Sequence, residues 1–291
     1  MRPVCARGGV TVVAKLTNKQ VIRVRHQKRD VFLVGTMHYN PVSIAKARET
    51  VTELNSQGKL GALVLETCPT RWQKTLSFQP PGSLMHALLM NEFQSASEAA
   101  PDVVPILGDM RIEDLTGKLK TSLKETTLDI LIPTRWQSYR ADVERAFDGE
   151  IKAANEEGVT ELGDIFDVRL LANVPVSLFR YPLAWMLKSP ALMVPFATFW
   201  LTIAALPGIV ESIPDTAQQT TAETVVTDVF LALDILQILL LTKCFLGVLL
   251  RDRNDILAKS ISDACEGIDE EQSVVAILGA AHLNGVHRRL L

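Results

Sequence analysis

The fold is decided by two similar stretches, Val31-Phe32-Leu33-Val34-Gly35-Thr36-Met37-His38 and Val274-Val275-Ala276-Ile277-Leu278-Gly279-Ala280-Ala281-His282. Each is a short apolar run that ends in Gly-x-x-His. A bounded apolar run of this length predicts a buried strand, and a glycine just past it indicates a tight turn. Each stretch therefore places a histidine beyond the carboxyl end of a strand, which is the edge of an open parallel sheet where ligands bind.

Between these stretches the chain alternates helical and strand patterns. Asn40 and Pro41 are typical of a helix start, and the next apolar run, Ala62–Leu65, ends at Glu66. A helix is predicted from about Ser83 to Ala100, and a strand over Val103–Leu107 precedes Asp109. This strand–helix–strand order predicts an α/β fold whose crossover is right-handed.

The composition limits the classes of function. The chain has 291 residues with a formal net charge of −3 and no basic stripe interleaved with aromatics, so nucleic acid is excluded as a partner. Its four cysteines form no Cys-x-x-Cys pair, which argues against a disulfide framework or a zinc knuckle and favours a reducing compartment. Signatures of zincins, serine hydrolases, P-loop enzymes and dinucleotide enzymes are absent from the sequence.

The N-terminal segment has two interpretations. Its first acidic residue is Asp30, which follows eight basic residues, and an acid-poor start of this kind is typical of an organelle transit peptide. The favoured alternative is a β-hairpin in which the alternating run Val10–Ala14 pairs with Val21–Val24.

Two hydrophobic runs predict a membrane hairpin. Ser189–Val210 carries no charge, and Val225–Leu250 is longer but contains a few polar residues. Basic residues flank the pair and the loop between the runs is acidic, which fits the positive-inside rule. We therefore expect residues 181–250 to form a helical hairpin in a membrane, an organelle membrane being one option. The alternative is a soluble helical lid.

Residues 1–180 and 251–291 would form the two parts of one α/β domain, with a mixed, mostly parallel sheet and flanking helices.

Four apolar runs thus end in polar residues, namely His38, Glu66, Asp109 and His282, which parallel strands would bring to one edge. Two histidines and a carboxylate suit a divalent transition metal with open positions for water and substrate. We predict His38, Glu66 and His282 as ligands of manganese, cobalt or zinc, and Glu66 or Asp109 as a third ligand or general base. Arg253 and Arg111 would hold a carboxylate or an oxyanion. A shared metal requires the two imidazole nitrogens to lie within about 3–4 Å of each other. Structural histidines remain the alternative.

These motifs resemble the TraB/PrgY family, which is related to the Tiki proteins. The matching segments run in the family's order over Leu33–His38, Val64–Glu66, Asn91–Glu92, Leu107–Asp109, Arg251–Asn254 and Gly279–Gly285. The resemblance implies a metal-dependent hydrolase-type fold that uses manganese or cobalt in Tiki relatives, and it adds Asn254 to the substrate-binding residues. Two positions depart from the family pattern: Met110 displaces Arg111 by one residue, and Ala281 stands where glycine is commoner.

The sequence therefore predicts a membrane-attached TraB-like protein that acts as a metal-dependent peptidase or related hydrolase on a peptide or protein. The alternative is a non-catalytic peptide-binding regulator or membrane-tethering protein. The oligomeric state, the substrate and the identity of the metal are not decided by the sequence.

Overall fold

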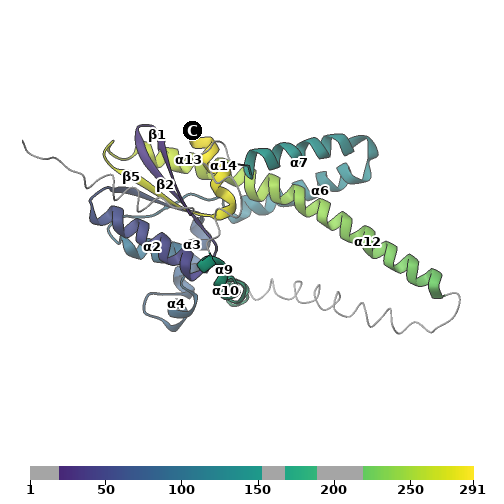
Figure 1. Ribbon diagram of the computed structural model, residues 1–291, viewed down its shortest axis with the longest axis horizontal. Helices are drawn as coiled ribbons and strands as arrows, with labels where there is room; N and C mark the ends of the chain where they lie inside the picture. The colour runs from purple at the N-terminus through teal and green to yellow at the C-terminus, as the bar shows by residue number, and fades with distance from the viewer. Residues whose placement is uncertain (1–19, 153–167, 189–218) are drawn as a thin grey trace, which may run out of the picture.

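The computed structural model describes residues 20–152, 168–188 and 219–291 (Figure 1). Its centre is a five-stranded sheet of order β1-β2-β5-β3-β4. Strand β1 (Val21–His26) is antiparallel to β2 (Arg29–Thr36), and all the other neighbours are parallel: β2 with β5 (Ser273–Gly279), β5 with β3 (Leu60–Leu65), and β3 with β4 (Ile106–Leu107). The predicted α/β fold with a mixed, mostly parallel sheet is confirmed.

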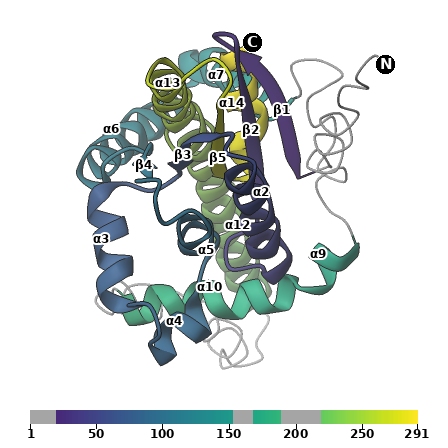
Figure 2. The ribbon, with the colours of Figure 1, turned by 90° about the vertical axis from the view of Figure 1, so that its left-hand side faces the viewer.

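Strand β5, from the C-terminal part of the chain, is the central strand. It lies between β2 and β3, with Thr36 opposite Gly279 and Leu65 opposite Ile277. All seven of its residues are buried, as expected for a strand covered on both faces. The two Gly-x-x-His turns therefore leave the sheet side by side, although more than 240 residues separate them (Figure 2).

Helices cover both faces of the sheet. Helices α2 (Pro41–Ser56) and α5 (Glu92–Ala99) pack on one face, against alternate strand residues such as Phe32 and Ile277. Helices α13 (Arg253–Glu266) and α14 (Leu283–Leu290) pack on the other face, against the intervening residues such as Leu33 and Leu278. The alternation follows from the period of two along each strand.

The remaining helices form two groups. Helices α6 (Ile112–Leu131) and α7 (Trp136–Glu150), joined by the 3₁₀ turn η1 (Pro133–Arg135), pack with α12 (Gln219–Cys244) and extend away from the sheet (Figure 1). A π-helix, η3 (Phe245–Asp252), joins α12 to α13. Helices α3 (Pro69–Phe78), α4 (Leu84–Leu89), α9 (Val168–Ala172) and α10 (Val174–Lys188) lie below the sheet as drawn in Figure 2.

Three local predictions differ from the structure. Val21–Val24 pairs with Val31–Val34 through a turn at Gln27 and Lys28, both with positive φ, and the predicted partner Val10–Ala14 lies outside the described residues. The single helix predicted over 83–100 is two helices, because the Asn91 side chain accepts a hydrogen bond from Gln94 N and starts a new one. The strand predicted over 103–107 is reduced to Ile106–Leu107, since Pro105 has no N–H to donate.

The predicted membrane hairpin is only partly within the described residues. The run Ser189–Val210 lies outside them, and the run Val225–Leu250 falls in α12 and η3. Of the helices that the structure describes, none combines the length and the apolar character needed to cross a membrane.

Candidate functional site

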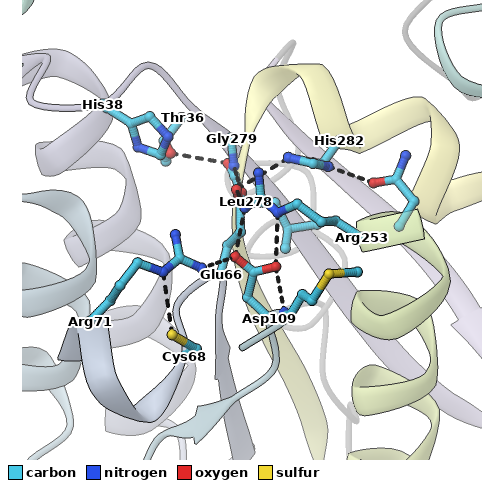
Figure 3. Close-up of polar contacts among 12 residues, drawn as sticks. Thr36, His38, Glu66, Cys68, Arg71, Asp109, Arg253, Leu278, Gly279 and His282 are labelled. Carbon is cyan, nitrogen blue, oxygen red and sulfur yellow. Dashed lines mark hydrogen bonds and ion pairs between the residues drawn. The ribbon is translucent and has the colours of Figure 1, made fainter. Parts of the chain in front are cut away.

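Polar side chains from four strand ends meet at the carboxyl edge of the sheet (Figure 3). Glu66 directly follows β3, and Asp109 comes two residues after β4. His38 comes two residues after β2, and His282 ends the 3₁₀ turn η4 (Ala280–His282) that follows β5. The positions of these residues at strand ends, predicted from the sequence, bring them into one cluster.

Glu66 is the centre of the cluster and is only 3 % exposed. Its Oε2 accepts a hydrogen bond from the backbone N–H of Gly279, and its Oε1 contacts Arg253 Nη2 and, at 3.2 Å, His282 Nε2. Burial favours the neutral carboxylic acid, but the charges of His282 and Arg253 outweigh it and hold the pKa of Glu66 well below its usual value. Glu66 is therefore an ionised carboxylate at neutral pH.

Arg253, the first residue of α13, connects Glu66 to Asp109. Its Nε lies 2.9 Å from Asp109 Oδ1 and its Nη2 lies 2.6 Å from Asp109 Oδ2, a bidentate pair. Arg71 Nη2 also contacts Asp109 Oδ2, while Arg71 Nε donates to Cys68 Sγ at 3.4 Å. Burial works against the charge of Arg253, but the pull of Glu66 and its bonds to Asp109 raise its pKa above the ordinary value.

His38 is held by groups that the sequence analysis did not assign to the site. Its Nδ1 lies 2.5 Å from Glu92 Oε1, and the other oxygen of Glu92 accepts from Tyr39 N at 3.2 Å. The ring stacks on Tyr181 of α10 with centroids 5.8 Å apart. Burial lowers the pKa of His38, but the charge of Glu92 and the hydrogen bond to it, with a smaller pull from Glu66, raise it to about 9. His38 is thus protonated at neutral pH in the absence of another cation.

His282 is held by a chain of buried side chains. Its Nδ1 lies 2.6 Å from Asn254 Oδ1, and Asn254 Nδ2 donates to Glu150 Oε2 at 2.6 Å. Arg289 makes two hydrogen bonds to the Glu150 carboxylate. Because the Asn254 amide is oriented by Glu150, its carbonyl oxygen faces His282 and places the imidazole proton on Nδ1. The other ring nitrogen, Nε2, then lies on the side of Glu66, 3.2 Å from its Oε1.

Gly279 leaves a space between the two imidazoles and Glu66. A methyl group on its Cα would lie 3.2 Å from Glu66 Oε2 and 3.6 Å from both His282 Cδ2 and His38 Nε2. These two histidine atoms are therefore at most twice 3.6 Å apart. The absence of a side chain at this position allows all three groups to face one small volume.

The chemistry of this volume fits a divalent metal ion. Each imidazole has its Nδ1 bound to an acceptor, which is the arrangement that fixes metal-binding histidines and directs Nε2 at the ion. The buried cluster also contains three carboxylates, Glu66, Asp109 and Glu92, but only two guanidinium groups, those of Arg71 and Arg253. The excess negative charge is neutralised by a proton on an imidazole of the cluster or by a bound cation.

The side chains of the cluster are not arranged as a complete coordination shell for a metal ion. Within the ranges that the structure describes, no three His, Cys, Asp or Glu side chains are placed to hold a metal ion as they stand. The pairing of Glu66 with Arg253 accounts for this, since the guanidinium lies beside one of the predicted ligand atoms. Metal binding would require a side-chain movement of Glu66, Arg253 or His38.

Two predicted substrate-binding residues do not face the cluster. Arg111 is exposed immediately before α6, and its side chain makes no hydrogen bond or ion pair with a described residue. Asn254 is fully buried behind His282, so it orients that histidine and is out of reach of a substrate. Both placements have a local cause: Arg111 precedes a helix that leads away from the sheet, and Asn254 lies one residue beyond the inward-facing Arg253 on α13.

Sequence reasoning gave no role to Arg71, Glu92 or Tyr181. Glu92 follows the helix cap Asn91, where an acidic residue is ordinarily explained by the helix dipole. Its complete burial, which the sequence does not reveal, distinguishes it from such a residue. His26 and His86 lie outside the cluster and pair with Ser262 and Glu98 respectively.

Comparison of the chain with protein-family models, curated proteins and solved structures finds no match. The resemblance to the TraB/PrgY family therefore rests on the motifs in the sequence and stays a prediction.

Proposed function

We propose that this protein is a TraB-like metal-dependent hydrolase in which His38, Glu66 and His282 hold a divalent ion such as manganese, cobalt or zinc. One observation supports this most: two imidazoles from opposite ends of the chain face the same buried carboxylate, each with its Nδ1 held by a buried partner. A divalent ion held there would supply Lewis-acid activation of water and of a substrate carbonyl.

Arg253 is the residue best placed to stabilise negative charge on a substrate. Its Nε and Nη2 are bonded to the two carboxylates, while its Nη1 makes no hydrogen bond to any described residue. The free edge of the guanidinium can donate to a substrate carboxylate or an oxyanion.

Asp109 holds Arg253 in this orientation. Both of its carboxylate oxygens already accept hydrogen bonds from Arg253, Arg71 or Met110 N. This occupancy favours a positioning role for Asp109 over the general-base role predicted from the sequence.

The membrane attachment of the enzyme is part of the proposal. The uncharged run Ser189–Val210 lies between the two segments that build the sheet. A segment that enters and leaves the membrane on one side returns the chain to the α/β domain, which allows β5 to pair with β2 and β3. Peptides or proteins at that membrane are the proposed substrates.

A non-catalytic peptide-binding or tethering protein is the second candidate. The hydrogen bonds within the cluster favour this candidate, because the carboxylates of Glu66 and Asp109 are fully hydrogen-bonded without a metal. A site of this kind is stable as a structural element without performing chemistry.

A cleavage assay separates the two candidates. The full chain, supplied in turn with manganese, cobalt and zinc, is incubated with a library of internally quenched peptides. The enzyme proposal predicts metal-dependent cleavage that is abolished by a chelator and by Glu66→Gln, but retained by Glu98→Gln, whose carboxylate pairs with His86 elsewhere. Peptide binding without cleavage under every metal would support the second candidate and refute the first.

A further inference from the structure

Helix α10 exposes an unusual face to solvent. Its outward side chains recur at helical spacing and carry no charge: Pro175, Leu178, Phe179, Pro182, Trp185 and Met186. Leu178 and Phe179 are each 69 % exposed, and Trp185 is 52 % exposed. The opposite face, with Ser177 and Ala184, is buried. This polarity is the reverse of that of an ordinary surface helix, whose apolar side faces the core.

The apolar face continues onto neighbouring helices. Val168 and Leu171 of α9 are exposed, as are Leu84 and Leu88 of α4. Helix α4 packs against α10 through Leu89 and Ala184, and Figure 2 shows α4, α9 and α10 on the same lower side of the molecule. Contiguous exposed apolar patches are uncommon on soluble monomers, so an apolar surface that continues over three helices indicates a partner.

The charges near this face indicate which partner it is. From Val168 to Val210 the sequence contains no Asp or Glu, whereas Arg169 lies on α9 and Arg180 on α10. Cationic residues beside apolar side chains, with tryptophan among them, are typical of helices that lie in the interface of a membrane containing anionic lipids. The uncharged run Ser189–Val210 also starts directly after the last residue of α10.

We propose that the outer face of α9 and α10, with Leu84 and Leu88 of α4, lies in the headgroup and upper acyl region of an anionic bilayer. The proposal deepens the membrane attachment proposed above and assigns the surface that contacts lipid. It also links the membrane to the candidate site, because Tyr181 of α10 stacks on His38 and Lys188 of α10 donates to Tyr39 Oη at 3.3 Å. The site then lies next to the bilayer surface, where α10 forms one of its walls.

Tryptophan fluorescence tests this surface without requiring metal or activity. Two full-length variants keep one tryptophan each, Trp185 or Trp136, with the other three changed to phenylalanine. Trp136 is a matched control because it is 58 % exposed and lies at the start of α7. The proteins are bound to vesicles of phosphatidylcholine and phosphatidylglycerol, with and without lipid brominated in the upper acyl chain.

The proposal predicts that the emission of Trp185 shifts to the blue and is quenched by the brominated lipid, whereas that of Trp136 is not. Phe179→Glu in the Trp185 protein should abolish this quenching, and Val104→Glu, at another strongly exposed position, should leave it unchanged. Vesicle-bound protein with unquenched Trp185 would overturn the lipid-facing surface while leaving membrane attachment intact. Failure to bind vesicles at all would overturn both. A concentration-dependent blue shift of Trp185 without lipid would overturn the proposal in favour of a second copy of the chain.

Discussion

The single positive charge of Arg253 lies between two buried carboxylates, those of Glu66 and Asp109, and offsets part of their negative charge. Its side chain is 12 % exposed, while those of Glu66 and Asp109 are 3 % and 0 % exposed. Such an ion pair contributes little net stability compared with apolar residues, but removal of one partner leaves buried charges uncompensated. The residue therefore connects α13 to β3 and β4 in the folded protein even without a catalytic function.

Arg253→Met should lower the free energy of unfolding by about 3–5 kcal/mol at neutral pH. The surface pair Arg23–Asp30 offers a control, and Arg23→Met should cost less than about 1 kcal/mol. Urea denaturation of both variants measures the difference. Equal losses for the two substitutions would mean that Glu66 and Asp109 are not buried charges that depend on Arg253.

His38 provides a pH-dependent test of the metal-free site. Its pKa rises from the ordinary value of 6.5 to about 9 on folding, chiefly because Glu92 overcomes the effect of burial. A raised pKa in the folded state contributes stability that is complete below pH 6.5 and is lost as the pH rises through about 9. The difference in unfolding free energy between wild type and His38→Gln, measured with a chelator present, should therefore shrink across this window. A difference that does not vary between pH 6 and pH 10 would contradict the assigned pairing with Glu92.

At the scale of the elements, the turn after β5 determines the shape of the site. Gly279 has φ −59°, which any residue can adopt, so its role lies in the absent side chain. Its N–H also holds Glu66 in place. The turn thus combines a hydrogen-bond donor with the space that the two histidines and the glutamate face.

Gly279→Ala should retain the fold but prevent metal binding. The added methyl group needs only a small displacement of Glu66 Oε2, and alanine reduces the entropy of the unfolded chain, so stability should change by less than about 1 kcal/mol. Calorimetric titration with manganese or zinc should show loss of binding, whereas Gly149→Ala, where the new methyl meets no atom within 4 Å, should bind normally. Unchanged affinity in Gly279→Ala would place the metal elsewhere.

The strands that end at the site were predictable because each is a bounded apolar run that stops at a polar residue. The break at Met90–Asn91 was not, since apolar residues continue on both sides of it and only the cap of Asn91 divides the two helices. The role of Glu92 in the site was not predictable either. Its identity as a partner of His38 depends on the tertiary placement of α5, which the local sequence does not carry.

At the scale of the whole molecule, the site depends on joining two distant parts of the chain. Strand β5 pairs with β2 on one side and β3 on the other, and this pairing brings His282 beside Glu66 and near His38. The sequence indicated that these strand ends share an edge, because a repeated Gly-x-x-His pattern is visible in the residues. It did not give the strand order or the guanidinium beside Glu66, which arise from packing between α13 and the sheet.

Measuring the metal content of the protein tests directly whether His38 and His282 bind one divalent ion. The purified full chain is dialysed against manganese, cobalt or zinc, freed of excess ion and examined by elemental analysis. We expect about one ion per chain, lost in His38→Ala and in His282→Ala but retained in His86→Ala, whose imidazole pairs with Glu98 outside the site. A wild-type protein that binds none of the three metals, or variants lacking His38 or His282 that bind as much as wild type, would contradict it.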